Sequence, residues 1–239
     1  MSVLLNENDF VWRTPDYRTP DIIASYEIPQ DIDYQFVEGD EFKVIVPAKA
    51  YIETNATPAI EATSSDIANA AVNSTALTIT FQLPQLIPTN YYDIKDIVEI
   101  ITVSGTSYTK LGYGTTAGNW EYDSSTKTFT VHLSSVASVT LWIYYTPQLG
   151  TIDIVHRIPG GVKTTILVSN STTNQHIMYD PGLAPVRIKK NEYLAARTYI
   201  DIVVYPRTIN NTNKYKFDPL RPDGSISDVC LIELPIHRV

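Results

Sequence analysis

Four histidines are the side chains in this sequence best suited to acid-base or metal chemistry, because imidazole titrates near neutral pH and is a common metal ligand. They stand far apart, and none has a second histidine, a cysteine or a carboxylate at a spacing typical of metal chelation. We therefore expect each of them to be an ordinary strand residue. They are His132, His156, His176 and His237.

Other patterns with known chemistry are incomplete. Asp31 and Asp33 resemble the start of a calcium loop, but Phe36 occupies the position at which such a loop needs glycine. Gly112 and Gly114 have no helix pattern after them and do not predict a phosphate-binding loop. The sequence contains no nucleophile elbow and no lysine-containing glycine loop. We therefore predict no catalytic, cofactor-binding or metal-binding residue and no enzymatic activity.

The single cysteine excludes an internal disulfide. Cys230 lies in the apolar run 229–234, where burial would raise the pKa of a thiol and make it unreactive. A reactive nucleophile is the alternative, and these apolar neighbours disfavour it. We expect a buried, inert side chain.

Four Asn-x-Ser/Thr triplets are present, and chance explains most of them in a chain rich in Asn and Thr. A host that glycosylates structural proteins could modify the triplets that lie in loops. Asn73, Asn170 and Asn210 fall in predicted loops and are the glycosylation candidates. Asn55 is disfavoured because Pro58 follows its triplet.

Composition and charge describe a folded, weakly charged protein. Hydrophobic residues make up 44% and charged residues 18% of the 239 residues, enough to bury a substantial core. With 18 basic and 26 acidic residues the net charge is −8, which disfavours nonspecific binding to nucleic acid or anionic membranes. No apolar run is long enough to span a bilayer. The start, MSVLLNENDF, lacks a basic segment before an apolar core, so we expect synthesis in the cytoplasm without a signal peptide.

The longest run with one structural period is residues 186–206, and its period of two predicts a strand over residues 193–205. Ile200, Ile202 and Val204 fall on one side, which we expect to be the buried face, while Tyr199 and Tyr205 fall on the other. A short helix over residues 191–197 is the alternative. The β-branched residues that follow argue against its continuation.

The rest of the chain predicts an all-β protein in four parts. Residues 1–33 carry a repeated Arg-Thr-Pro-Asp and several aromatic side chains, which favours an extended N-terminal arm that packs on its own body or on another subunit. Residues 34–74 begin the main domain with a core strand through Phe42, Val44 and Val46. A loop with one helical turn near residues 65–71 follows it.

Residues 75–147 predict an inserted β module, because five short β-rich segments are separated there by Ser, Gly, Thr and Asp. Its clearest hairpin lies within residues 120–133. Residues 148–239 supply the longer strands of the main domain. The simplest arrangement is a jelly-roll β-sandwich interrupted by a second, smaller inserted β-sandwich module.

Tyrosine accounts for 16 residues, against 6 phenylalanines and 3 tryptophans. Its amphipathic ring suits half-buried strands and subunit interfaces better than a dry core. We therefore take the aromatic residues of the arm and of the outer side of the 193–205 strand as interface candidates. They are Trp12, Tyr17, Tyr26, Tyr199 and Tyr205.

Together these features resemble the jelly-roll virion proteins of tailless icosahedral DNA viruses of bacteria and archaea. The features are the aromatic arm, the 193–205 strand after Pro181-Gly182-Leu183-Ala184-Pro185, the Thr/Ser/Tyr-rich β module and the lack of a catalytic set. The resemblance implies a capsid, penton or turret subunit that binds copies of itself and other virion proteins through repeated interfaces. It transfers no functional residue, since such a family is defined by its fold.

The alternative is a carbohydrate- or receptor-binding β-sandwich of a fibre or adhesin, whose partner would be a glycan or a host receptor. Aromatic platforms suit sugar stacking. Trp120, Tyr122, Trp142 and Tyr144 could form one, although Trp142 and Tyr144 share a strand face that we expect to be core. An enzyme is a third class that the motifs do not favour.

Overall fold

The computed structural model shows an all-β protein and describes residues 1–13, 21–29, 33–54, 62–65, 67–83, 97–135, 139–145, 150–158, 160, 163–171, 176–178, 187–188, 197–205, 208–209, 213–214 and 217–239. The chain divides into two compact units. Unit 1 contains Met1–Val46, Leu149–Pro206 and Cys230–Val239, and unit 2 contains Pro47–Gln148 and Arg207–Val229. In the described part of the chain, no helix is long and apolar enough to cross a membrane.

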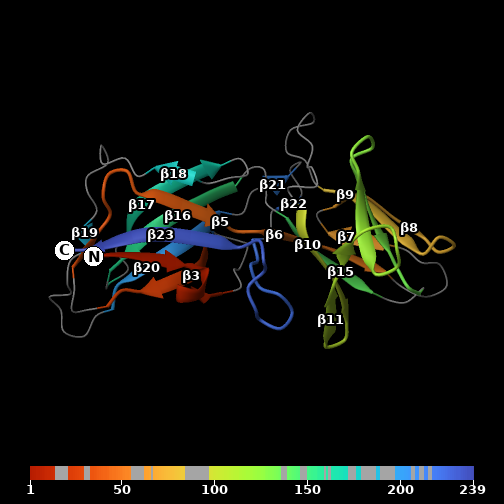
Figure 1. Ribbon diagram of the computed structural model, residues 1–239, viewed down its shortest axis with the longest axis horizontal. Helices are drawn as coiled ribbons and strands as arrows, with labels where there is room; N and C mark the ends of the chain where they lie inside the picture. Colours follow the sequence, from red (N-terminus) through yellow and green to blue (C-terminus); the bar gives the residue numbers. More distant parts are fainter. Residues whose placement is uncertain are drawn as a thin grey trace. The chain divides into compact units, whose positions relative to one another are not determined.

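Two sheets form unit 1 (Figure 1). The first has the order β18-β5-β23-β4-β19, with β1 also paired to β23; the second has the order β17-β16-β20-β3-β2. The strands of the first sheet are β1 (Ser2–Asn6), β4 (Tyr34–Gln35), β5 (Glu41–Ile45), β18 (His176–Met178), β19 (Arg187–Ile188) and β23 (Leu231–Arg238). Those of the second are β2 (Val11–Trp12), β3 (Asp21–Glu27), β16 (Gly150–Arg157), β17 (Lys163–Ser171) and β20 (Tyr199–Tyr205).

The core of unit 1 follows from alternation along these strands. Phe42 and Val44 on β5 are buried, as predicted, and Val44 lies opposite Ile232 of β23. On the second sheet Ile154 of β16 lies opposite Ile202 of β20, and both are at most 1% exposed. Residues directly opposite in an antiparallel pair share a face, so each sheet presents one apolar face to the core.

The N-terminal segment is not a separate arm, contrary to our expectation. β1 pairs with β23 over five residues, and β3 is an internal strand between β20 and β2. Ile23 and Ala24 on β3 are fully buried. The prolines that argued against a central strand, Pro15 and Pro20, precede β3 and so cost its ladder no hydrogen bond. The segment therefore belongs to the sandwich of unit 1.

The strand predicted over residues 193–205 is present from Tyr199 to Tyr205 as β20, and it is buried on both sides rather than on one. Ile200 and Ile202 are fully buried, as predicted, yet Asp201 is also 0% exposed and Val203 is 5% exposed. Asp201 is tolerated there because Ser25 and Arg157 on the neighbouring strands bind its carboxylate. Residues 191–196, where a short helix was the alternative, lie outside the described residues.

Unit 2 likewise contains two sheets, and in its described part each of them has five strands (Figure 1). One has the order β11-β10-β15-β6-β7 and the other β12-β13-β14-β9-β8, and a two-stranded ribbon joins β21 to β22. The first contains β6 (Ala48–Thr54), β7 (Ala62–Ser65), β10 (Ile97–Ser104), β11 (Ser107–Lys110) and β15 (Thr140–Tyr145). The second contains β8 (Ala68–Asn73), β9 (Thr78–Gln82), β12 (Gly112–Tyr113), β13 (Asn119–Asp123) and β14 (Thr128–His132), and the ribbon is β21 (Thr208–Ile209) and β22 (Asn213–Lys214).

The predicted hairpin within residues 120–133 is confirmed. β13 and β14 pair antiparallel, with Trp120 opposite Val131. Phe129 and Val131 are buried, and the Phe129 ring stacks on Phe81 of β9 with centroids 5.4 Å apart. The alternation of apolar and polar residues along β14 therefore gives one buried face, as the sequence predicts.

Unit 2 begins earlier than the predicted module and takes a second piece of chain from residues 207–229. The predicted loop with a helical turn near residues 65–71 is wrong, because β7 and β8 occupy that region. These strands consist mostly of Ala, Ser and Asn, and alanine and asparagine are depleted in strands. Pairing with β6 and β9 supplies the hydrogen bonds that the side chains do not predict. As a result the two units are of similar length.

We predict that Ile202→Ala lowers the free energy of unfolding by about 2 to 5 kcal/mol, because it leaves a cavity under a fully buried strand. Leu4→Ala, at a side chain that is 54% exposed, is the control and should change it by less than about 0.5 kcal/mol. Urea unfolding of both variants measures the difference. Equal effects would contradict the assignment of Ile202 to the core.

Candidate functional site

Several charged residues of unit 2 lie where residues 217–229, here called the return segment, pack against the β6–β15–β10 sheet. Glu99 of β10, Tyr144 of β15 and Lys49 of β6 lie directly opposite one another and share a face of that sheet. All three are buried. This face points away from Leu141 and Ile143, which alternate with Tyr144 along β15, so the return segment covers the second face of the sheet.

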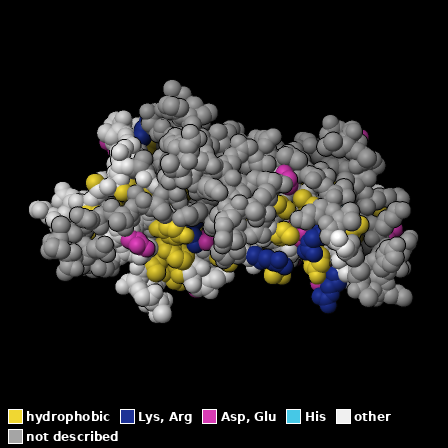
Figure 2. All heavy atoms as spheres, turned by 180° about the vertical axis from the view of Figure 1, so that it is seen from behind, with side chains coloured by type: hydrophobic (Ala, Val, Ile, Leu, Met, Phe, Trp, Pro, Cys, Tyr) yellow, Lys and Arg dark blue, Asp and Glu magenta, His cyan; other side chains and the backbone are white. Residues whose placement is uncertain are grey.

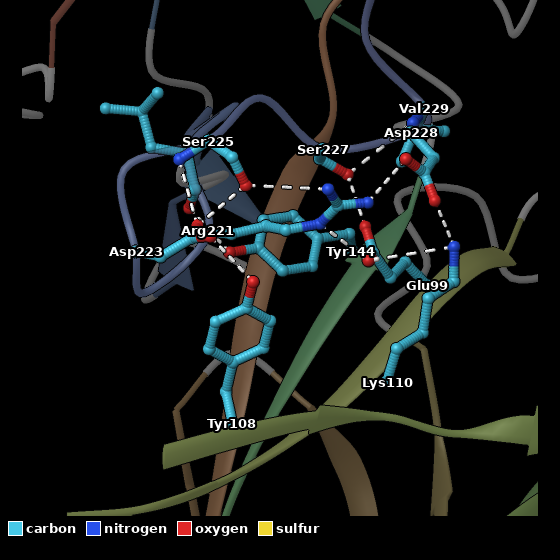
Figure 3. Close-up of polar contacts among 11 residues, drawn as sticks. Glu99, Tyr108, Lys110, Tyr144, Arg221, Asp223, Ser225, Ser227, Asp228 and Val229 are labelled. Carbon is cyan, nitrogen blue, oxygen red and sulfur yellow. Dashed lines mark hydrogen bonds and ion pairs between the residues drawn. The ribbon is translucent and has the colours of Figure 1, made fainter. Parts of the chain in front are cut away.

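Glu99 is the centre of a polar network on that face (Figure 3). Its carboxylate is fully buried and accepts hydrogen bonds from Nε of Arg221 (2.8 Å) and from the Ser227 hydroxyl (2.9 Å). Arg221 also pairs with Asp228 at 2.5 Å, and Lys110 of β11 contacts both Asp228 and, at 3.8 Å, Glu99. A buried carboxylate is stable when it is paired and hydrogen-bonded, and Glu99 meets this condition.

The network sets the protonation of its members. Burial disfavours the charge on Arg221, but the hydrogen bonds that it donates to Glu99 and Asp228 outweigh burial and raise the pKa of the guanidinium above its usual range. Hydrogen bonds from Lys110 and Arg221 lower the pKa of Asp228. Arg221 and Asp228 are therefore held in their charged forms near neutral pH, which suits an ion pair and not a general acid or base.

The tip of the return segment is a tight turn, as the Arg-Pro-Asp-Gly sequence predicts. The amide of Gly224 donates to the Arg221 carbonyl at 2.9 Å, and Gly224 has a φ of +80°, which glycine adopts without strain. Asp223 accepts hydrogen bonds from the Ser225 hydroxyl (2.6 Å) and from the Tyr108 hydroxyl of β11 (2.6 Å), which lower its pKa to about 2. The turn is thus tied to β11 (Figure 3).

Lys49 and Asp218 make a second contact between the sheet and the return segment. Their side chains form an ion pair, although they are only 6% and 8% exposed. Nζ of Lys49 also lies 4.0 Å from the centroid of the Trp142 ring. The Tyr144 hydroxyl donates to the Leu220 carbonyl at 2.6 Å, so aromatic and charged groups hold the same segment.

Unit 1 has its own buried ion pair. Arg157 of β16 donates from Nε to Asp201 at 2.6 Å and from Nη2 at 3.2 Å, and the Ser25 hydroxyl donates to the same carboxylate at 2.7 Å. The guanidinium of Arg157 also stacks 4.1 Å from the Tyr199 ring. Asp201 is thereby saturated, and the pair holds three adjacent strands together.

The four histidines are all strand residues, as predicted. Within the described residues, no group of three or more His, Cys, Asp or Glu side chains is placed to hold a metal ion. His132 bonds Glu121 at 3.0 Å and His237 bonds Asp40 at 2.8 Å. Cys230 is buried, and burial raises the pKa of its thiol, so it is inert as predicted.

Three of the interface candidates, Trp12, Tyr26 and Tyr199, lie in unit 1 and are half-buried. Trp12 donates from Nε1 to the Glu7 carbonyl at 2.8 Å, and the Tyr26 ring lies 6.0 Å from that of Phe10. Tyr199 lies under Arg157. Tyr17 lies outside the described residues, and Tyr205 is in β20.

Two of the three glycosylation candidates are not in loops. Asn73 is the last residue of β8, and its Oδ1 accepts hydrogen bonds from the amides of Thr75 and Ala76 in the turn that follows. Asn170 is paired with Thr151 because β17 runs two residues beyond its predicted end. Asn210 lies outside the described residues. Asn73 is exposed but already caps its own turn.

The proposed sugar platform is not formed. Tyr144 is fully buried and Trp120 is 8% exposed. Trp142 contacts Lys49, and its ring lies 6.2 Å from Tyr51. These aromatic side chains therefore pack within unit 2 instead of presenting open faces for stacking.

The sequence reasoning missed the Glu99 and Lys49 contacts. Glu99 and its partner Arg221 are 122 residues apart, so no local spacing joins them. A signal was available, because Glu99 is a lone charge inside the apolar strand Ile97–Ser104. A charge in such a position needs a buried partner, and the partner's identity comes only from the fold.

We predict that Arg221→Met destabilises unit 2 by about 3 to 5 kcal/mol, because it leaves the buried Glu99 carboxylate without its main partner. Adding Glu99→Gln should recover much of this loss, since the uncompensated charge is then gone. Lys110→Met is the control; this half-exposed residue should cost at most about 1 kcal/mol. Urea unfolding followed by tryptophan fluorescence measures all three. An Arg221→Met cost no larger than that of Lys110→Met would contradict the network's role.

We also predict that His156 makes unit 1 less stable in mild acid. Burial lowers the pKa of this histidine from 6.5, with opposition from Asp201, and its Nε2 has no hydrogen-bond partner among the residues that the structure describes. Below about pH 6.5 the unfolded chain therefore binds a proton that the folded chain does not. The free energy of unfolding consequently decreases as the pH is lowered. Urea midpoints between pH 8 and pH 5 should decline less in His156→Leu than in the parent chain. An unchanged pH slope would contradict the role of His156.

Comparison with known proteins was made for the whole chain. No protein-family model matches the sequence, and no curated protein matches it. Among solved structures, it is similar to a chain of the VP16-VP17 complex of the two major capsid proteins of bacteriophage P23-77, with a TM-score of 0.59 and 13% identity over 100% of this chain and 99% of that one. It is also similar to VP17, a capsid protein of bacteriophage P23-77, with a TM-score of 0.56 and 12% identity over 99% of this chain and 93% of that one.

These similarities confirm the predicted fold class, an all-β jelly-roll sandwich with a second β-sandwich inserted in it. At such low sequence identity they show the fold alone. The resemblance inferred from the sequence is therefore confirmed at the level of the fold: the chain has, from end to end, the fold of capsid proteins of a bacteriophage.

Proposed function

We propose that this protein is a non-enzymatic structural subunit of a virus capsid. The observation that carries the proposal is the end-to-end match, because 100% of this chain and 99% of a capsid-protein chain are covered. Both units are included in that match, so no part of the chain is left over as a separate catalytic domain. Fold similarity alone does not fix a function, so the internal chemistry must agree with it.

The chemistry of the described residues agrees with a structural role. Each buried carboxylate of the three ion-pair contacts has a cation as its partner: Glu99 pairs with Arg221, Asp201 with Arg157 and Asp218 with Lys49. Their geometry ties together segments that are distant in sequence. Cys230, the one thiol, is buried. Such saturated polar groups stabilise a fold and do not turn over a substrate.

Assembly would use surfaces that are still apolar and accessible in the single chain. β2 is an edge strand of the second sheet of unit 1, its Val11 is 68% exposed, and Trp12 beside it is half-buried. An edge strand with exposed apolar side chains is a natural site for association. Figure 2 shows hydrophobic side chains in small groups, with basic and acidic ones near them, on one face of the protein.

The partners that we propose are copies of this chain and a second virion protein, since one structural neighbour is a complex of two capsid proteins. Trp12, Tyr26 and Tyr199 stay candidate interface residues, because half-buried aromatic side chains are common anchors in interfaces. The chain would then be a component of the virion, as capsid, penton or turret subunit. We propose no nucleic-acid or glycan partner.

We predict that the purified chain assembles as its concentration rises, alone or with other proteins of the same virion, and that Val11→Glu weakens this assembly at least tenfold in the concentration required. A charge on an apolar contact must be desolvated, whereas Val11→Thr keeps the shape and should assemble nearly as well. Sedimentation velocity measures assembly, and urea unfolding should show that both variants fold, since Val11 is exposed.

The possible outcomes test the proposed capsid function and the proposed interface at β2 separately. If the parent chain stays monomeric at every concentration and with every virion protein, the proposed function is wrong. If it assembles and Val11→Glu assembles equally well, the function stands and the β2 edge is not the interface.

A further inference from the structure

The ion pair between Lys49 and Asp218 has a geometry that goes beyond a salt bridge. An isolated β-bridge joins Ala48 to Phe217, the residues just before the pair. The amide of Asp218 also donates to the Pro47 carbonyl at 3.2 Å. The two backbones therefore hold the side chains in contact, and Nζ of Lys49 faces Oδ2 of Asp218.

Aromatic rings enclose this contact. Nζ of Lys49 lies 4.0 Å from the centroid of the Trp142 ring and 5.8 Å from those of Tyr51 and Tyr144. The two charged side chains are more than nine-tenths buried. The rings stabilise the ammonium, but taking both charges out of water is costly, and a neutral product would remove that cost.

The two oxygens of the Asp218 carboxyl have different environments. Oδ1 accepts a hydrogen bond from the amide of Leu220 at 3.0 Å, whereas Oδ2 faces the amine. A backbone N–H fixed on one oxygen stabilises negative charge that develops there when a nucleophile attacks the carboxyl carbon. Oδ1 is therefore placed to become an amide oxygen, and Oδ2 is placed to leave.

We propose that Lys49 and Asp218 become joined by an amide bond between their side chains, so that β6 is covalently linked to the return segment. One ammonium proton passes to Oδ2, giving a neutral amine and a neutral acid. Nζ then attacks Cγ, the Nζ–Cγ bond forms, a second proton passes from Nζ to Oδ2, and the Cγ–Oδ2 bond breaks to release one water. The reaction consumes no oxidant, reductant or other reactant.

Orientation is what makes this condensation fast. Well-oriented groups within one molecule react as if at about 10⁵ to 10⁸ M, and the burial of both side chains limits the access of water that would hydrolyse the product. The pair of Lys110 and Asp228 provides a contrast inside the same unit. Its side chains are 47% and 54% exposed, so water competes there and we expect no bond.

Intact-mass spectrometry of the purified full-length chain tests the proposal. The folded protein should weigh one water less than its sequence predicts. Digestion with trypsin should then yield a branched peptide that joins the segment around Lys49 to the segment around Asp218. Trypsin should not cleave after Lys49, because the side chain of that lysine is then an amide. Lys49→Arg, which keeps the charge but cannot form this amide, should have the full sequence mass, whereas Lys110→Arg should still lack one water.

A full sequence mass for the folded parent chain would overturn the proposal, and so would a water loss that persists in Lys49→Arg. A loss of water located at Asp223-Gly224 would also overturn it, because an Asp-Gly sequence can close on its own backbone to a cyclic imide. The branched peptide distinguishes these cases. Capsid assembly does not enter the measurement, so its result is separate from that of the proposed function.

Discussion

The contact between the return segment and the second face of the β6–β15–β10 sheet is the constraint on which unit 2 depends. One face of that sheet packs in the sandwich core through Leu141 and Ile143. The other face carries Glu99 and Lys49, and neither charge would be stable there without Arg221 and Asp218. The return segment thus covers an apolar sheet and neutralises two charges at once. It also leads directly into β23, a strand of unit 1.

This constraint explains why unit 2 is built from two separate stretches of the chain. Unit 2 is completed by residues 207–229, which come after most of unit 1 has been made. Its partners Glu99 and Arg221 are 122 residues apart, and in unit 1 Ser25 and Asp201 are 176 residues apart. Long-range closure of this kind is slow to form, but it ties distant segments into one cooperative structure.

The sequence predicted the elements that local patterns control. Phe129 and Val131 alternate with polar residues along β14, and Phe42 and Val44 alternate along β5, so both strands and their buried faces were found. β7 and β8 were missed because they are rich in alanine and asparagine, which are depleted in strands. The N-terminal strands were taken for an arm because proline was weighed more heavily than Ile23 and Ala24. Charge partners could not be found, since pairing across 122 residues leaves no local pattern.

The functional conclusion depends on shape more than on any single residue, because 13% identity carries over no functional side chain. Its most direct test is electron cryo-microscopy of purified virus particles that contain this chain. The account predicts a closed shell in which density for both β-sandwiches of the chain repeats with the symmetry of the particle. A shell without that density, or particles from which the chain is absent, would contradict it.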